Sequence, residues 1–130
     1  MNHFMEVKIY YEDTDCGNVV YYANYLRYME RARTEYMADR GAPVKTLIDQ
    51  GTLFMITHAE VDYRSSARYG DTLVVETWVS ETTGATLTFQ HAMKEKTTGK
   101  LITECKAIAV CVDLTGKPKR IPREALEKLQ

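Results

Sequence analysis

The chain has 130 residues, the size of one ordinary domain, and its 45% hydrophobic and 27% charged residues are typical of a globular protein. Seventeen basic residues against eighteen acidic ones leave a formal net charge of -1, which argues against nucleic acid or an anionic membrane as a partner. The sequence contains no apolar run of the roughly 18 residues that a membrane helix needs, and no secretory signal. We therefore expect a single domain over residues 1–130, in the cytoplasm and without an integral membrane segment.

The cysteines and histidines give no sign of a metal or redox site. The 3 cysteines are odd in number and lack a Cys-x-x-Cys spacing, which fits neither a disulfide framework nor a zinc ribbon. Cys16 has acidic neighbours that oppose formation of a thiolate, so we do not expect a cysteine nucleophile. The 3 histidines show no paired ligand spacing. We expect no metal and no cofactor.

The N-terminal part of the chain reads as a strand followed by a turn-rich loop. From Met5 to Tyr11 apolar and polar residues alternate, which predicts a half-buried strand that ends before Glu12. The next residues, Asp13–Asn18, are of types that form turns by bonding their own backbone or by tolerating a positive φ. A loop is therefore expected between the first strand and the next element.

A long helix begins near Asn24 and is stopped by Gly41, before Pro43. A helix of roughly 17 residues would extend about 26 Å. Four residues at helical spacing form its apolar face: Tyr25, Met29, Ala32 and Tyr36. One or two further helical turns are expected over Val44–Gln50.

The remaining chain reads as four long strands separated by glycine-containing turns. Their expected ranges are Leu53–Arg64, Thr72–Glu81, Ala85–Lys96 and Leu101–Asp113. Five strands and one long helix predict an α+β domain, in which a strongly twisted antiparallel sheet curls around the helix. The last strand is compatible with burial on both of its faces, which favours a subunit interface because one helix covers only one face.

The segment Tyr11–Glu35, with the sequence YEDTDCGNVVYYANYLRYMERARTE, resembles the signature of hotdog-fold acyl-CoA thioesterases. Within that superfamily it is similar to the 4-hydroxybenzoyl-CoA thioesterase and YbgC-like group. Two later segments agree with this resemblance, Tyr63–Asp71 with its turn Arg68–Asp71 and Asp113–Pro122 with Gly116–Pro118, so that it covers nearly the whole chain. The resemblance implies a hotdog fold, which is a curved antiparallel five-stranded sheet wrapped around one long central helix. It also implies an acyl-CoA substrate and a homodimer with the active site at its interface, two such dimers often forming a homotetramer.

The resemblance implies two site residues. Asp15, the second acid of the Asp-x-Asp loop, corresponds to the catalytic carboxylate of the family. Tyr22 lies where a backbone N–H at the start of the long helix polarises the thioester carbonyl. The chemistry is sound without the family, because a carboxylate can serve as nucleophile or base at neutral pH and free N–H groups at a helix start can receive a developing oxyanion. The plain alternative is that Asp15 only forms a turn.

Neighbouring residues are given structural roles. Asp13 is expected to hold the loop through its own hydrogen bonds, and Tyr25 and Tyr28 are expected in the core. Arg64 and Arg68 can meet the phosphates of coenzyme A, although an arginine near a turn is more often only solvated. No substrate-binding residue is assigned.

Two departures from the family pattern concern the substrate. YbgC-like members commonly have His where Tyr22 stands, so no imidazole role transfers to this chain. The hydroxybenzoyl-type enzymes carry a basic cluster before their fourth strand for the nucleotide phosphates, whereas this chain has the neutral residues Thr82–Ala85 there. The acyl group and the mode of nucleotide binding therefore remain open.

Three functions are compared. The leading hypothesis is an acyl-CoA thioesterase that releases a free acid and coenzyme A, with Asp15 attacking directly or activating water. The alternative is a non-catalytic hotdog module that binds acyl-CoA or an acyl carrier. Hydratase chemistry of the hotdog type ranks last, because the loop from Asp13 to Tyr22 contains no histidine.

Overall fold

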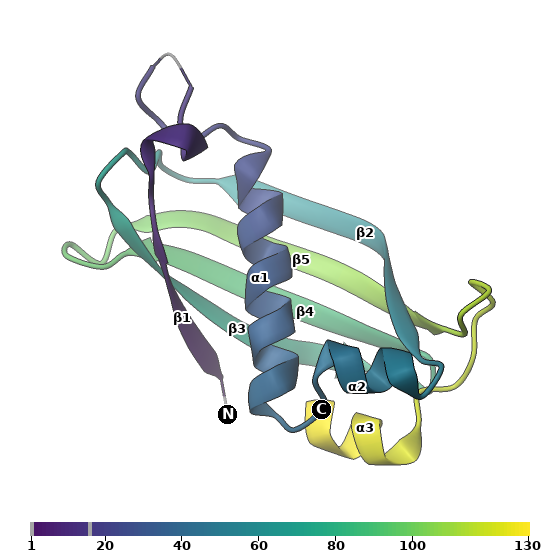
Figure 1. The fold of residues 1–130 in the computed structure, drawn as a ribbon. Coiled ribbons are helices and arrows are strands. Elements are labelled where there is room, and N and C mark those ends of the chain that lie inside the picture. The colour runs from purple at the N-terminus through teal and green to yellow at the C-terminus, as the bar shows by residue number, and fades with distance from the viewer. Residues whose placement is uncertain (1, 16) are drawn as a thin grey trace.

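The computed structural model describes residues 2–15 and 17–130, and one sheet dominates it (Figure 1). Its five strands stand in the order β1-β3-β4-β5-β2, and every neighbouring pair is antiparallel. The strands are β1 (His3–Lys8), β2 (Leu53–Tyr63), β3 (Thr72–Thr82), β4 (Thr86–Glu95) and β5 (Leu101–Val112). The four long strands match the ranges expected from the sequence to within about two residues, so the antiparallel five-stranded sheet is confirmed.

Helix α1 (Asn24–Asp39) lies across one face of this sheet, as Figure 1 shows. The four residues of its expected apolar face are all buried, and so are Tyr28 and Met37. On the sheet, alternate residues of the strands form the buried face toward this helix, among them Leu73, Val75 and Phe89. The prediction of a sheet wrapped on one long helix is therefore confirmed, and Tyr25 and Tyr28 do belong to the core.

The first strand is shorter and earlier than the sequence predicted. It was expected over Met5–Tyr11, but β1 ends at Lys8 and a short 3-10 helix, η1, covers Tyr11–Asp13. Pairing with β3 stops at Lys8 because Thr72 opposite is the first residue of β3. Beyond that point Asp13 accepts a hydrogen bond from the backbone N–H of Tyr10, 2.8 Å away, which favours a tight turn over an extended chain.

Two short helices close the far end of the sheet. Helix α2 (Val44–Asp49) agrees with the expected extra turns, whereas α3 (Arg123–Leu129) was not predicted. Figure 1 shows the two packed together near the C-terminal end of α1. Burial of Ala125 and Leu129, together with a hydrogen bond from the hydroxyl of Tyr36 to the carbonyl of Leu129 (2.9 Å), fixes α3 there. None of the described helices is long and apolar enough to cross a membrane.

Strand β2 forms one edge of the sheet, and most of its residues are exposed. Met55 and Ile56 are 51% and 39% exposed although both are large and apolar. Among the described residues β2 pairs only with β5, so its other side presents unpaired backbone groups. The edge strand is thus suited to receive another chain.

Candidate active site

The loop before α1 folds back on itself as a small antiparallel ladder. Thr14 and Val20 form a β-bridge, and the N–H of Asp15 donates to the carbonyl of Val19 at 3.0 Å. Asn18 sits at the tip with a φ of +62°, a conformation that asparagine tolerates better than most residues. The ladder brings Asp15 back toward the start of the helix, as a seven-position spacing to Tyr22 allows.

A second segment, which follows β2, clamps this ladder from the side. The N–H of Val20 donates to the carbonyl of Ala67 at 2.8 Å, and Val19 forms a β-bridge with Arg68. The N–H of Ala67 in turn donates to the buried hydroxyl of Tyr25, at 3.3 Å. Loop, strand end and helix α1 are therefore held together by hydrogen bonds between their backbones and one core tyrosine.

Asp13 is a structural residue of this loop. Its Oδ1 accepts a hydrogen bond from the side-chain amide of Asn24 at 2.7 Å, and its Oδ2 accepts the Tyr10 N–H already described. Both carboxylate oxygens are thereby engaged in joining η1 to the first residue of α1. The expectation that Asp13 holds the loop is confirmed.

Asp15 is placed differently. Its side chain is exposed, and its Oδ1 accepts a hydrogen bond from the N–H of Gly17 at 2.9 Å. A Cβ at Gly17 would lie 3.3 Å from that same oxygen, so the close approach favours glycine. Within the described residues Oδ2 accepts no hydrogen bond, which leaves one carboxylate oxygen oriented and available.

The chain enters α1 through a turn that leaves backbone donors free. The N–H of Asn24 donates to the carbonyl of Tyr21 at 2.8 Å, and that of Leu26 donates to the carbonyl of Ala23 at 3.2 Å. In the part of the chain that the structure describes, the N–H groups of Tyr22 and Ala23 donate to no acceptor. They stand at the positive end of the helix dipole, a position that favours negative charge.

Asp15 and Tyr22 line one hollow of about 400 Å³. Its other lining residues are Val19, Val20, Tyr25, Tyr63, Arg64, Ser65 and Ser66. The structure thus brings together the two residues that the resemblance selected, and it adds the end of β2 and the segment after it. A carboxylate, a residue with an unpaired N–H and aromatic walls in one hollow suit attack on a carbonyl group.

Tyrosine side chains build one wall of the hollow. The ring of Tyr63 meets that of Tyr22 at 6.4 Å and that of Tyr25 at 5.7 Å, both edge to face. Burial raises the pKa of Tyr25 and of Tyr63, and it raises that of Tyr28 to about 12. These phenols therefore stay protonated at neutral pH and can donate hydrogen bonds.

The negative charge of Asp15 affects the pKa of a neighbouring tyrosine, Tyr21. Hydrogen bonding and charge at Tyr22 raise the pKa of Tyr21, and the Asp15 carboxylate raises it further. The rings of Tyr21 and Tyr22 lie 4.7 Å apart. The Asp15 carboxylate therefore acts on the phenol of Tyr21, the residue before Tyr22.

The arginines, the cysteine and the histidines considered from the sequence lie in different parts of the structure. Arg64 lines the hollow and its Nε lies 3.8 Å from a carboxylate oxygen of Glu104. Arg68 does not line it, and besides its β-bridge with Val19 its backbone N–H donates to the Asp71 carboxylate at 2.9 Å. Cys16 lies outside the described residues. His91 is buried in the core, whereas His58 is exposed beside Glu60, and neither lines the hollow. The described residues contain no group of three or more potential metal ligands.

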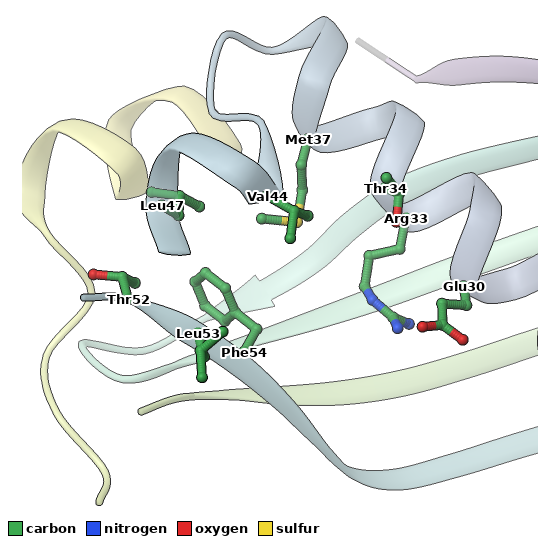
Figure 2. A pocket seen from close by; sticks show the side chains of 9 residues that line it. All are labelled: Glu30, Arg33, Thr34, Met37, Val44, Leu47, Thr52, Leu53 and Phe54. Atoms are coloured by element: carbon green, nitrogen blue, oxygen red, sulfur yellow. The ribbon is translucent and has the colours of Figure 1, made fainter. Parts of the chain in front are cut away.

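A second, smaller pocket of about 120 Å³ lies between α1, α2 and the beginning of β2. Figure 2 shows Arg33 and Glu30 turned toward each other there, beside apolar side chains such as Phe54 and Val44. Burial lowers the pKa of Arg33, and the charge of Glu30 opposes that change. Because this pocket contains neither Asp15 nor Tyr22, we place the candidate active site at the larger hollow.

Comparison with known proteins shows the family of the chain. The family model of the thioesterase-like superfamily matches residues 10–129. The chain belongs to this superfamily. It is similar to the acyl-CoA thioesterase YbgC of Haemophilus influenzae, with 41% identity over 120 residues, which are 91% of this chain and 87% of the relative. It is 34% identical to the acyl-CoA thioester hydrolase YbgC of Escherichia coli O6:H1 over 126 residues, which are 95% and 92% of the two chains.

A solved structure supports the fold. The 4-hydroxybenzoyl-CoA thioesterase from Pseudomonas sp. strain CBS-3 has a TM-score of 0.89 and 24% identity, with 98% of each chain covered. The resemblance to hotdog-fold thioesterases of the YbgC-like group is therefore confirmed, as is the expectation of a thioester hydrolase.

Sequence analysis missed Tyr63 and its neighbours Ser65 and Ser66 as site residues. Tyr63 ends β2 and the two serines follow it, about 40 positions after Tyr22, and only the packing of the strand end against the helix start brings them to the hollow. The one signal was a tyrosine at the polar end of a long strand, which is too common to indicate a site.

Proposed function

We propose that this protein hydrolyses acyl-CoA thioesters in the hollow between Asp15 and the start of α1. The observation that carries the proposal is that Asp15 and Tyr22, a residue whose N–H is free among the described residues, line one hollow. Its products are a free acid and coenzyme A. The similarity to YbgC thioesterases supports the same class of substrate.

Asp15 supplies the negative charge that begins the reaction. Its Oδ1 is held by Gly17, so the carboxylate is oriented without a histidine or lysine partner. The free oxygen either attacks the thioester carbon or takes a proton from a water that attacks it. In both routes the carbon–sulfur bond breaks, and the coenzyme A thiolate leaves and takes up a proton.

The helix start stabilises the oxyanion. As the carbonyl becomes tetrahedral, its oxygen gains negative charge, and donors that are already oriented toward it lower the barrier. The N–H of Tyr22, which lines the hollow, is free to do this, and the dipole of α1 adds to its effect. In comparable sites one such donor lowers the barrier by about 3 kcal/mol.

Single turnover in water labelled with oxygen-18 separates the two routes for Asp15. If the carboxylate attacks, an anhydride between Asp15 and the acyl group forms, and water that opens it on the aspartyl side leaves label in the protein. If Asp15 acts as base, water attacks the thioester directly and all label enters the free acid. Mass spectrometry of the peptide that contains Asp15 reads the result.

We also propose that the protein forms a homodimer through the free edge of β2. Its unpaired backbone groups and its exposed apolar residues Met55 and Ile56 support this edge as the interface. Light scattering on the purified protein gives the mass of the assembly, and a monomer at micromolar concentration contradicts the proposal. A mass of four chains would indicate that two dimers associate.

Release of free thiol from a panel of acyl-CoA substrates tests the function. The panel runs from short aliphatic to long aliphatic and aromatic acyl groups, with each substrate also incubated without protein. We expect turnover with at least one class. Saturable binding with no thiol release from any of them would instead indicate the non-catalytic module.

A further inference from the structure

Tyr63 makes a contact at the helix start that the proposed chemistry does not yet use. Its hydroxyl donates a hydrogen bond to the backbone carbonyl of Tyr22, at 2.9 Å, across 41 positions of sequence. Tyr63 is the last residue of β2, so this bond ties the edge of the sheet to the entrance of α1.

The carbonyl of Tyr22 lacks the backbone partner that a regular helix would give it. An α-helical N–H four residues later, that of Leu26, donates to Ala23 instead. Among the described residues Tyr22 O accepts only from Tyr63. The phenol therefore takes the place of a missing backbone donor, at the point where the turn becomes a helix.

This carbonyl belongs to the same residue as one of the two free donors. Tyr22 lines the hollow, whereas Ala23 is not among its lining residues, so the N–H of Tyr22 is the donor that the hollow can use. The peptide groups on both sides of Tyr22 are planar, so only its φ and ψ remain to be fixed. A bond that holds the carbonyl of Tyr22 restricts ψ and therefore helps to keep the residue, with its N–H, in one place.

The surroundings keep Tyr63 in place without burying it. Its ring packs edge to face on Tyr25, which is only 2% exposed, while its own side chain remains half exposed and lines the hollow. The phenol is thus oriented by a core residue, and its removal costs the core little.

We propose that Tyr63 is a positioning residue, which holds Tyr22 at the entrance of α1 so that the N–H of Tyr22 receives the thioester oxyanion. This inference rests on the proposed function. Preorganised donors accelerate the chemical step more than they strengthen substrate binding. Loss of the phenol should therefore lower kcat and leave KM nearly unchanged.

The first test compares Tyr63→Phe with the wild type and with Tyr69→Phe. Tyr69 is an exposed tyrosine whose ring contacts Tyr11 and does not line the hollow. With an acyl-CoA that the wild type cleaves, we expect Tyr63→Phe to lower kcat about tenfold, the typical weight of one hydrogen bond, with KM within about twofold. Tyr69→Phe should have the kcat and KM of the wild type, and all three proteins should have similar melting temperatures.

A second test separates hydrogen bonding from packing. A ring-fluorinated tyrosine at position 63 keeps the shape of the side chain, but its phenol ionises nearer to neutral pH. Its kcat should fall as the pH rises through the pKa of the analogue, because a phenolate cannot donate to the Tyr22 carbonyl. Wild-type kcat should stay flat over the same range. A merely structural role would move neither pH profile.

Several outcomes overturn the inference. An unchanged kcat in Tyr63→Phe does so, and so does a loss confined to KM, which would make Tyr63 only a wall for the acyl group. A fluorotyrosine profile that matches the wild type would have the same meaning. If the wild type cleaves no acyl-CoA, the proposed function fails and this inference falls with it, whereas wild-type turnover with unaffected variants removes Tyr63 alone.

Discussion

Asp13 and Asn24 are joined side chain to side chain across the loop, with 2.7 Å between a carboxylate oxygen and the amide nitrogen. Asp15, two residues later, lines the hollow and makes its only described side-chain hydrogen bond with Gly17. Two acids of one short motif thus have separate tasks, one in holding the loop and one in chemistry. Substitutions at the two positions should separate these tasks.

Asp13→Ala should destabilise the protein. It removes the acceptors of the Tyr10 N–H and of the Asn24 amide, and the second of these bonds is partly buried. We expect the free energy of unfolding to fall by about 2 kcal/mol. Urea unfolding measures this change. A variant as stable as the wild type would show that neither bond contributes.

Asp15→Asn should abolish turnover and leave stability unchanged. The amide oxygen of asparagine can still accept from Gly17, but it neither attacks a thioester nor takes a proton. We expect kcat to fall at least about 100-fold, with the free energy of unfolding within about 0.5 kcal/mol. Glu12→Gln, at an exposed acid outside the hollow, is the matched control. Retained hydrolysis by Asp15→Asn would refute the mechanism.

Tyr25→Phe should loosen the clamp on the loop. The Ala67 N–H, fully buried, would lose its acceptor and remain without a partner. The expected cost is about 1–3 kcal/mol of unfolding free energy. Thermal unfolding beside the exposed variant Tyr69→Phe measures it, and equal melting temperatures for the two variants would show that water replaces the phenol.

Leu129→Ala should be among the more damaging changes away from the hollow. Leu129 is 0% exposed at the C-terminal end of α3, and its truncation leaves a cavity against the end of α1. We expect a loss of about 2–5 kcal/mol. The half-buried Leu126 on the same helix provides the comparison, since Leu126→Ala should cost less. Equal losses would show that α3 is not anchored through Leu129.

Helix α3 also shows where sequence reasoning stops. The four long strands and α1 carry many periods of a regular apolar pattern, and their ranges follow from it. In α3 only Ala125, Leu126 and Leu129 are apolar, and this pattern of seven residues behind Pro122 is too short to distinguish from a loop. What fixes α3 is its packing on α2 and the bond from Tyr36, neither of which has a local signal.

The candidate site likewise contains residues that the sequence selects and a contact that it does not. Asp15 and Tyr22 stand in one motif, so the sequence and its resemblance select both. The bond from Tyr63 to Tyr22 depends on the register of β2 with β5 and on how far β2 runs beside α1. A pairing so distant along the chain follows from the tertiary structure alone.

His91 should make stability depend on pH. Its Nδ1 lies 2.9 Å from the hydroxyl of Thr77, its Nε2 has no partner among the described residues, and its side chain is 1% exposed. Burial, with a smaller effect of the Arg33 charge, lowers its pKa from 6.5 to about 3. Between these values the unfolded chain binds the extra proton, so stability is fully present above pH 6.5 and is lost as the pH falls toward 3.

Urea unfolding at pH 7 and pH 5 tests this, since the linkage predicts a loss of about 2 kcal/mol over that interval. His91→Gln, whose amide can still bond Thr77, should be less stable overall but should lose this part of the pH dependence. His58→Gln, at an exposed position, should keep the wild-type slope. If the unfolding free energies of the wild type and of His91→Gln changed equally between pH 7 and pH 5, the buried imidazole would accept a proton without cost, and the prediction would be wrong.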